Sequence, residues 1–336
     1  MTAPAPRENP CLLGHAAAEA VTDEAIRAGR IHHAWLLTGP EGIGKATLAY
    51  RFARRLLAGP NAPAASVNDP ASPVFRRVAA GTHADLLTIE REWDDKRKRL
   101  RSEIVVDSAR GVADFLRLTP AEGGWRLVIV DGAEHLNRNA ANALLKVLEE
   151  PPPRAVLLLV CASPGRLLPT IRSRCRRLRL GELGPLAMDR VLTRCLPNMD
   201  AAGRTALAAL SDGSPGRAVA LAEEQGVEIA ALVSDVLRAA PNLPVLRAHE
   251  VADKLARNDA GFATFMDLLR DAISAAVRNA VRGQADAGQQ RLASLRPLAE
   301  WGDLWHALTR LQDDTERFNL DKRHAIVSSL DLLNAP

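Results

Sequence analysis

Residues 125–153 restrict the fold of this chain more than any other stretch. Leu127 to Val130 is a continuous apolar, β-branched run, which is typical of a strand buried on both faces of a parallel sheet. The run ends on Asp131, and open α/β sheets bind their ligands where the strands end. From Asn139 the apolar residues recur at helical spacing until Pro151, because proline cannot continue a helix.

Two interpretations of Asp131 stay open at this point. In nucleotide-binding sites, a buried strand tipped with Asp holds a magnesium ion, directly or through water. An ordinary core strand also needs a polar residue where it leaves the sheet. The strand alone favours neither interpretation.

A second predicted strand leads into a glycine-rich loop. Ala34 to Leu37 is a short apolar run, and T-G-P-E-G-I-G-K-A-T and a helical pattern over Leu48 to Leu57 follow it. Strand, glycine loop and helix in this order are the context of a phosphate-binding loop, in which backbone N–H groups and a helix N-terminus face phosphate oxygens. The candidate residues of this loop are Gly39, Gly42, Gly44 and Lys45.

The loop departs from the pattern G-x-x-x-x-G-K-[ST] at its last position. Ala46 offers no hydroxyl to a magnesium ion. Thr47 is kept among the candidate site residues, but it is rotated about 100° further round the helix and we expect it to face elsewhere. The sequence therefore indicates a degenerate nucleotide site.

The rest of the chain divides into an α/β part and a helical part. Strands are predicted at Leu86 to Ile89, Val156 to Val160 and Leu178 to Leu180, with helices at Ala16 to Arg27 and from an N-cap at Asp107 to about Leu118. This alternation predicts a three-layer α/β domain with a parallel sheet. Beyond about Gly181 the patterns are almost wholly helical.

The helical part contains one especially clear amphipathic helix, Phe262 to Val281. Trp301 and Trp305 lie four residues apart, on one face of a further helix, and we expect them to pack in a core rather than stack on bases.

Two polar segments interrupt the α/β pattern. Residues 58–73 show no periodicity and predict a loop or insertion. Residues 90–103 are densely charged around Lys96-Arg97-Lys98-Arg99. This cluster could contact a phosphate backbone, but we expect a mobile, solvated loop.

The composition excludes several classes of protein. With 47% hydrophobic residues, the chain is globular rather than disordered. The net charge of +4 neither requires nor excludes a nucleic-acid partner. No apolar segment approaches the ~20 residues of a membrane span, and the N-terminus lacks the apolar core of a signal peptide. We therefore expect a cytoplasmic protein.

The cysteines argue against a metal or disulfide framework. Cys11, Cys161, Cys175 and Cys195 lie far apart and form no C-x-x-C pair. This spacing fits a reducing cytosol, and no metal site is expected.

Together, several motifs resemble the clamp-loader branch of the AAA+ ATPases. These are the glycine loop, the strand ending at Asp131, N-A-L-L-K-V-L-E-E-P-P at 142–152 and S-R-C at 173–175. The motifs G-T-H-A-D-L at 81–86, H-A-W-L before the loop and G-S-P-G-R-A at 213–218 narrow the resemblance to the delta-prime subunits of bacterial DNA polymerase III clamp loaders. The resemblance is dense over about residues 10–220 and weak beyond.

This resemblance implies roles for two arginines. In clamp loaders the arginine of S-R-C, here Arg174, projects into the ATP site of a neighbouring subunit. Its planar, permanently charged fork suits the charge that develops on a transferring phosphoryl group. Arg217 corresponds to the second sensor arginine, which contacts the γ-phosphate. From the residues alone, Arg174 could also be one of several surface arginines, and Arg217 a solvated charge at a helix start.

The resemblance also implies the domain organisation and the partners. Residues 1–182 would be the AAA+ P-loop domain, 183–228 a small helical lid and 229–336 an all-α collar that joins the subunits into a ring of five. The partners would be ATPase subunits of the gamma/tau type, a clamp-opening delta-type subunit and, through the complex, the sliding clamp and primer-template DNA.

The departures from the active pattern of this family concern ATP hydrolysis. Active members carry Asp-Glu at the strand tip, where this chain has Asp131-Gly132 and a displaced Glu134. Of the residues at the first sensor position, only Ser163 could serve, and the zinc cysteines of many relatives are missing. Binding of ATP or ADP at the chain's own site is thus doubtful, as is Mg²⁺, and zinc is not expected. We expect that the chain has no autonomous ATPase activity. We expect it to be a subunit of the DNA-directed DNA polymerase (nucleotidyltransferase) holoenzyme.

Three functions follow from these patterns. The first is a delta-prime, or stator, subunit that supplies Arg174 in trans while the assembly loads a sliding clamp onto primed DNA. The alternative is a free-standing P-loop ATPase, such as a helicase loader or remodeller, which Lys45 and Asp131 favour and Ala46 and Gly132 oppose. The third is a DNA-binding module that uses Lys96 to Arg101.

Overall fold

The computed structural model describes residues 4–59, 62–63, 66–95, 99–122, 124–255 and 259–334. The chain forms two compact units, Met1–Met199 with Ser211–Arg217, and Asp200–Leu210 with Ala218–Pro336. The lid expected at 183–228 is therefore shared between the two units, and its boundaries, like those of the collar, stay a prediction.

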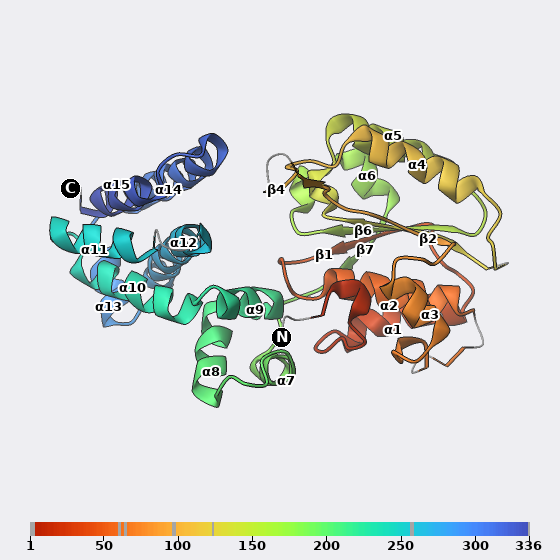
Figure 1. Cartoon of the computed structure of the whole chain (residues 1–336), viewed down its shortest axis with the longest axis horizontal. Helices are drawn as coiled ribbons and strands as arrows, with labels where there is room; N and C mark the ends of the chain where they lie inside the picture. Colours follow the sequence, from red (N-terminus) through yellow and green to blue (C-terminus); the bar gives the residue numbers. More distant parts are fainter. Residues whose placement is uncertain are drawn as a thin grey trace. The chain divides into compact units, whose positions relative to one another are not determined.

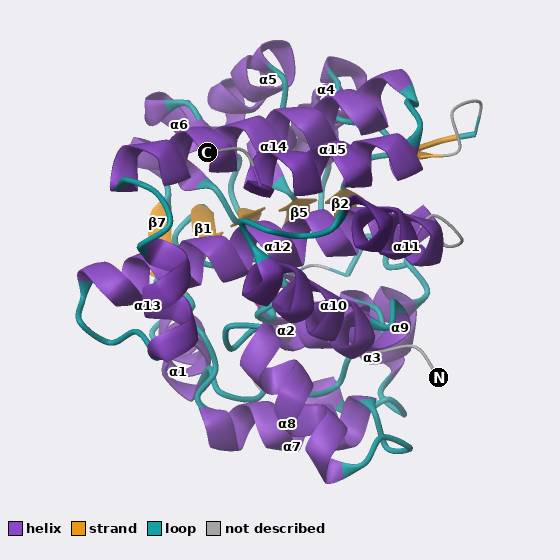
Figure 2. Ribbon diagram, turned by 90° about the vertical axis from the view of Figure 1, so that its left-hand side faces the viewer, coloured by secondary structure: helices purple, strands orange, loops and turns teal. Residues whose placement is uncertain are grey.

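The first unit is built on a parallel five-stranded sheet. Its strand order is β2-β5-β6-β1-β7, with β7 at one edge and β2 at the other (Figure 2). The strands are β1 (Ala34–Thr38), β2 (Leu86–Ile89), β5 (Arg126–Asp131), β6 (Ala155–Cys161) and β7 (Arg176–Arg179). Each predicted strand is confirmed within two residues at either end, and each neighbouring pair is parallel.

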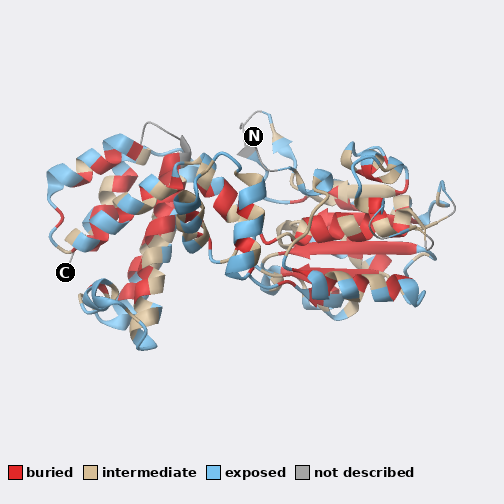
Figure 3. Cartoon of the chain, turned by 90° about the horizontal axis from the view of Figure 1, so that it is seen from below, coloured by how far each residue is buried: buried red, intermediate tan, exposed pale blue. Residues whose placement is uncertain are grey.

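Helices cover both faces of this sheet (Figure 1). One face carries α1 (Ala16–Arg27), α2 (Lys45–Leu57) and α3 (Pro73–Ala79), and the other carries α4 (Val106–Arg117), α5 (Arg138–Glu149) and α6 (Pro169–Arg174). The central strands β1, β5 and β6 are buried almost throughout, whereas the edge strands β2 and β7 are partly exposed (Figure 3). Most of the covering helices bury one side, while α2 is buried or half-buried along its whole length. The three-layer α/β architecture is confirmed.

The start of α5 illustrates how local sequence sets the elements. The Asn137 side chain accepts a hydrogen bond from the Ala140 N–H at 2.9 Å, which satisfies one of the unpaired donors at a helix N-terminus. The expected cap at Asp107 is wrong. Helix α4 starts at Val106, because Ile104 is fixed by backbone bonds to His135 and Asn137, and Asp107 lies within the first turn.

The two irregular segments contain more structure than expected. The first includes the short helix η2 (Ser66–Asn68) and leads into α3. The second forms an antiparallel hairpin, β3 (Trp93–Asp94) with β4 (Arg99–Leu100), so the expectation of a loop is wrong. The hairpin is closed by Arg101, whose N–H donates to the Glu92 carbonyl at 2.8 Å and whose guanidinium pairs with the Glu92 carboxylate at 3.0 Å. Residues 96–98 of the basic cluster lie outside the described residues.

The remaining described elements are helical, as expected. Short 3₁₀ helices are η1 (Pro6–Glu8), η3 (Ala133–His135) and η4 (Pro164–Arg166). The longer helices are α7 (Pro185–Cys195), α8 (Ala201–Leu210), α9 (Pro215–Glu223), α10 (Gly226–Ala239), α11 (Val245–Leu255), α12 (Asp259–Val281), α13 (Ala287–Ala293), α14 (Leu298–Phe318) and α15 (Lys322–Asn334).

The predicted core role of the tryptophans is confirmed for Trp301. Its side chain is 4% exposed, and its indole N–H donates to the Ala293 carbonyl at 3.2 Å, while Trp305 is half-buried. Among the described residues, we find no helix with the length and apolar character that crossing a bilayer requires.

Candidate functional site

The glycine loop between β1 and α2 adopts a backbone that only glycine accepts easily. Gly39, Gly42 and Gly44 have φ angles of 145°, 73° and 103°, in the region that L side chains rarely adopt. A Cβ atom on Gly39 would lie 2.2 Å from the Leu180 carbonyl oxygen. The strand, loop and helix therefore have the arrangement that the sequence predicts for a phosphate-binding loop.

A segment distant in sequence lies directly on this loop. The Ser214 hydroxyl donates to the Glu41 carbonyl at 2.7 Å, and the Gly216 N–H donates to the Gly42 carbonyl at 2.9 Å. We call Ser214 to Gly216 the latch. A Cβ on Gly42 would lie 2.5 Å from the Ser214 Oγ. The latch thus holds the loop tip through hydrogen bonds within the chain.

Lys45 is turned back onto the loop. Its side chain is 6% exposed, and Nζ donates to the Pro40 carbonyl at 2.5 Å. Burial lowers the pKa of this amine, while the nearby carboxylates of Glu134, Glu41 and Asp131 act in the opposite direction. The amine that would neutralise a phosphate is bonded to its own loop.

Asp131 lies at the carboxyl end of β5, where the sequence placed it. Burial, and then the charge of Glu90, raise the pKa of Asp131 to about 6, against the opposing charge of Lys45. The carboxylate is therefore partly protonated slightly below neutral pH.

Glu134 lies close to Lys45 and Asp131, although in the sequence it is displaced from the position directly after Asp131. Helix η3 carries it to the end of β6, where its Oε1 accepts from the Ala162 N–H at 2.8 Å. Its Oε2 is buried with no hydrogen-bond partner in the part of the chain that the structure describes. Burial, together with this carboxylate, raises the pKa of the Cys161 thiol to about 12. Ser163, the expected first sensor, is exposed.

The residues present fit a phosphate loop better than a magnesium-nucleotide site. Ala46 has no metal-binding group, and Thr47 is buried, 6% exposed, within α2. No group of three or more His, Cys, Asp or Glu side chains suitable for a metal occurs among the described residues. The backbone of the loop suits phosphate, but the side chains that hold magnesium and orient water are replaced or displaced.

Arg217 is brought to the same loop by the latch. Its backbone N–H donates to the Ser214 hydroxyl at 3.3 Å, and its guanidinium lies 3.7 Å from the Asp212 carboxylate. A Cβ on Gly42 would lie 3.0 Å from the Arg217 nitrogen. The structure therefore places together the predicted residues Gly42 and Arg217, which are far apart in sequence.

Arg174 lies apart from this site, in the opposite helical layer (Figure 1). It is the last residue of α6, which is anchored to the core by the fully buried Ile171. Its side chain is 36% exposed and its Nη2 lies 2.9 Å from the Glu149 Oε1. The guanidinium is therefore at the surface and not enclosed in the core.

Sequence reasoning used G-T-H-A-D-L as a family marker and missed its physical role. Asp85, 1% exposed, accepts from the N–H groups of Ala121 and Glu122 at 2.8 and 3.1 Å, and lies 3.4 Å from the Arg126 guanidinium. These contacts tie the turn before β5 to the start of the neighbouring strand β2. An acidic residue just before an apolar strand was the available signal.

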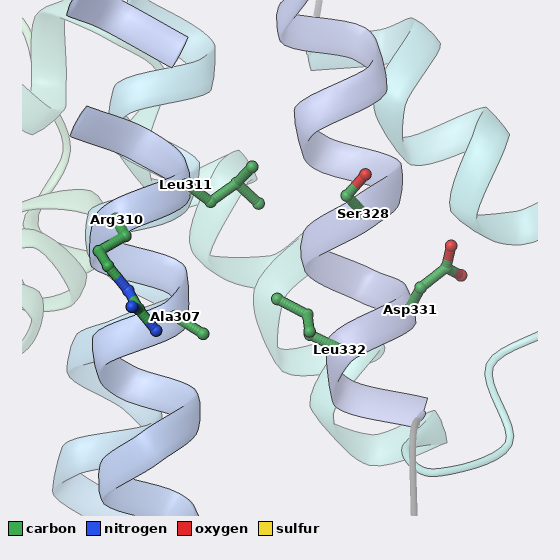
Figure 4. Close-up of a pocket in the computed structure, with 6 residues that line it drawn as sticks. All are labelled: Ala307, Arg310, Leu311, Ser328, Asp331 and Leu332. Atoms are coloured by element: carbon green, nitrogen blue, oxygen red, sulfur yellow. The ribbon is translucent and has the colours of Figure 1, made fainter. Parts of the chain in front are cut away.

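A pocket of about 550 Å³ lies in the helical unit, between α14 and α15. Figure 4 shows Leu311 and Leu332 directed into the space between these two helices. The other lining residues are Ala307, Arg310, Ser328 and Asp331. None of the predicted site residues lines this pocket.

Comparison with known proteins gives a consistent set of similarities. A family model described as "DNA polymerase III, delta subunit" matches residues 14–184, just over half of the chain. DNA polymerase III subunit delta' of Pseudomonas aeruginosa is 43% identical over 183 residues, which are 54% of this chain and 53% of that protein. The same subunit of Escherichia coli is 36% identical over 199 residues, 59% of this chain and 56% of that protein. The matches thus span just over half the length of these relatives.

A structural similarity extends further but is weak. The crystal structure of a DNA polymerase III gamma subunit-related protein from Thermotoga maritima covers 95% of this chain and 100% of its own, at 19% identity and a TM-score of 0.43. A TM-score this low supports no inference, so the assignment depends on the family model and the two sequence relatives.

Proposed function

Because the chain belongs to the DNA polymerase III delta subunit family, we propose that it is the delta-prime, or stator, subunit of a clamp loader. In this role it supplies Arg174 to the ATP site of a neighbouring ATPase subunit of the gamma/tau type. With a clamp-opening delta-type subunit, the assembly opens a sliding clamp and closes it around primed DNA. The names of the two relatives, both subunits of DNA polymerase III, support this assignment.

The observation that carries the proposal is the position of Arg174. Its side chain is 36% exposed, and the residue ends a short helix in the layer opposite α2. It can therefore approach a second molecule, while it belongs to a different layer from the chain's own glycine loop. A planar, permanently charged fork is the group that stabilises charge on a transferring phosphoryl group.

The state of the chain's own site supports a role in trans. Lys45 is bonded to Pro40, the latch bonds the loop tip, and Ala46 cannot hold magnesium. Removing one group that stabilises a transition state typically lowers a rate by a factor of about 10² or more. We infer that this subunit hydrolyses ATP negligibly by itself.

A second candidate, an autonomous P-loop ATPase, is favoured by one observation. Glu134 brings a carboxylate to the end of β6, beside Cys161 and close enough to Lys45 and Asp131 to influence their pKa values. Such a carboxylate could orient water. Turnover by the purified chain comparable to that of active P-loop ATPases would support this candidate and contradict the stator function.

Reconstitution tests the stator function directly. The chain is mixed with the clamp-loader ATPase and clamp-opening subunits of its own organism, and complex formation and clamp-dependent ATP hydrolysis are measured. The proposal expects a stable complex whose ATPase needs this chain. A chain that does not enter the complex, or that leaves its ATPase rate unchanged, contradicts the proposal.

A further inference from the structure

The ion pair between Arg174 and Glu149 fixes the direction of the exposed guanidinium. Nη2 lies 2.9 Å from the Glu149 Oε1, and Nη1 donates to the Thr170 carbonyl at 3.0 Å. Glu149 is the last residue of α5, and Thr170 lies one turn earlier than Arg174 on α6. Both terminal nitrogens of the guanidinium therefore contact their own chain.

The bond to Thr170 follows from the geometry of the helix. Thr170 and Arg174 lie four residues apart, so they are on the same side of α6, one turn from each other. The Arg174 side chain folds back along this turn, and its Nη1 donates to the Thr170 carbonyl. Glu149 holds the guanidinium there from the neighbouring helix.

We propose that Glu149 is a positioning residue that withholds Arg174 from the ATP site of a neighbouring subunit. This inference rests on the proposed function, since it assumes that Arg174 acts on a neighbour. In the free subunit the guanidinium is retracted onto Glu149 and Thr170. In the assembled complex it exchanges between Glu149 and the phosphates of the adjacent ATP site, so removing the Glu149 charge raises the fraction of the complex in which it reaches the phosphates.

The strength of the pair suits this exchange. The side chains of Arg174 and Glu149 are 36% and 50% exposed, and ion pairs exposed in this way favour the paired state by a factor of only about 1.4 to 5. A triphosphate carries several negative charges, and an arginine can bind its oxygens in a bidentate manner at a site shielded from water. The retracted state is therefore populated in the free subunit and gives way to a bound nucleotide.

Four variants test the proposal in the reconstituted complex: Glu149→Gln, Glu150→Gln, Arg174→Ala and the double variant Glu149→Gln/Arg174→Ala. Glu150→Gln is the matched control, because it removes the same charge one residue further along. We expect Glu149→Gln to raise the ATPase rate without clamp and DNA by about 1.4- to 5-fold, and so to reduce the stimulation ratio. Glu150→Gln should leave both rates unchanged, and the double variant should equal Arg174→Ala.

A chemical measurement on the free chain tests the retracted state without any activity. Phenylglyoxal modifies accessible guanidinium groups, and peptide mass spectrometry reports each arginine separately. We expect Arg174 to react about 1.4 to 5 times faster in Glu149→Gln than in the wild type. Arg177, exposed on β7, serves as the internal reference and should not change.

The outcomes separate this inference from the proposed function. If Arg174→Ala lowers the ATPase rate but Glu149→Gln leaves it unchanged or lower, the withholding role is wrong and the stator function stands. An unchanged phenylglyoxal rate, or a double variant that differs from Arg174→Ala, also overturns the withholding role. If Arg174→Ala leaves the complex unaffected, the stator function fails and the inference fails with it.

Discussion

Gly216 meets Gly42 so closely that neither position has room for a side chain. The Gly216 N–H donates to the Gly42 carbonyl at 2.9 Å, and a Cβ on Gly216 would lie 2.7 Å from the Gly42 Cα. This glycine pair joins the start of α9 to the phosphate-type loop. The same contact explains why residues 211–217 belong to the first compact unit.

Gly216→Ala should therefore loosen the latch. The added methyl group meets backbone atoms of Gly42, which cannot move aside as a side chain end could, and we expect a loss of about 1–3 kcal/mol in the free energy of unfolding. Hydrogen exchange of residues 211–217 should become faster. Gly111→Ala in α4 is the control, because nothing lies within 4 Å of its Cβ and alanine favours a helix interior by about 0.5–1 kcal/mol. Equal effects of the two substitutions would contradict the close contact.

Asp131→Asn should make stability less dependent on pH. Burial raises the pKa of Asp131 from 3.8 to about 6 in the folded protein, so the folded state binds a proton more tightly than the unfolded state. The stabilisation is fully present below pH 4 and is lost as the pH rises through 6. Between pH 4.5 and pH 7.5, the wild type should therefore lose about 1–3 kcal/mol more of its free energy of unfolding than the variant does. Urea unfolding at both pH values measures this, and a difference independent of pH would refute the raised pKa.

Lys45→Ala should have little effect on the assembled complex. Its amine donates to the Pro40 carbonyl of its own loop, and the proposed function uses no hydrolysis at this site. We expect clamp-dependent ATPase to stay within about twofold of the wild type, whereas loss of the corresponding lysine in an active P-loop site removes phosphate contacts that the reaction needs. A collapse of the rate in a fully assembled complex would show that this subunit hydrolyses ATP.

Asp85→Ala should destabilise the first unit strongly. The substitution removes the acceptor of two backbone N–H groups and leaves the Arg126 guanidinium, whose side chain is 8% exposed, without its buried carboxylate. Breaking a buried pair in this way typically costs about 3–5 kcal/mol. Asp107→Ala is the control, because its ion pair with Arg110 joins side chains that are 81% and 71% exposed, and it should cost less than about 1 kcal/mol. Thermal unfolding of both variants compares the two effects.

The sequence predicts those features that depend on short-range patterns. Helix α1 and strand β2 begin and end at the predicted residues, because apolar periodicity and burial agree there. The hairpin at Trp93 and Leu100 was missed, since two-residue strands with exposed side chains show no apolar alternation. Asp107 was assigned as a cap from residue type alone, while the helix start is set by the contacts of Ile104.

The candidate site likewise contains some features that short-range sequence patterns predict and others that depend on long-range contacts. The glycine loop, Asp131 and Arg174 are recognisable from local motifs. The latch on Gly42, the return of Glu134 to β6 and the pairing of Arg174 with Glu149 join residues far apart in sequence. Such contacts follow from the fold and leave no periodic signal in the chain.

The ATPase rate of the reconstituted clamp loader carrying Arg174→Ala tests the central claim most directly. An arginine finger contributes a factor of roughly 10³–10⁵ at the site that it completes. Because only the ATP site beside this subunit loses its arginine, we predict an intact complex whose clamp- and DNA-stimulated rate falls severalfold rather than to zero, and a normal rate for Arg177→Ala as the control. A complex that assembles fully and hydrolyses ATP at the wild-type rate without the Arg174 guanidinium would contradict the account.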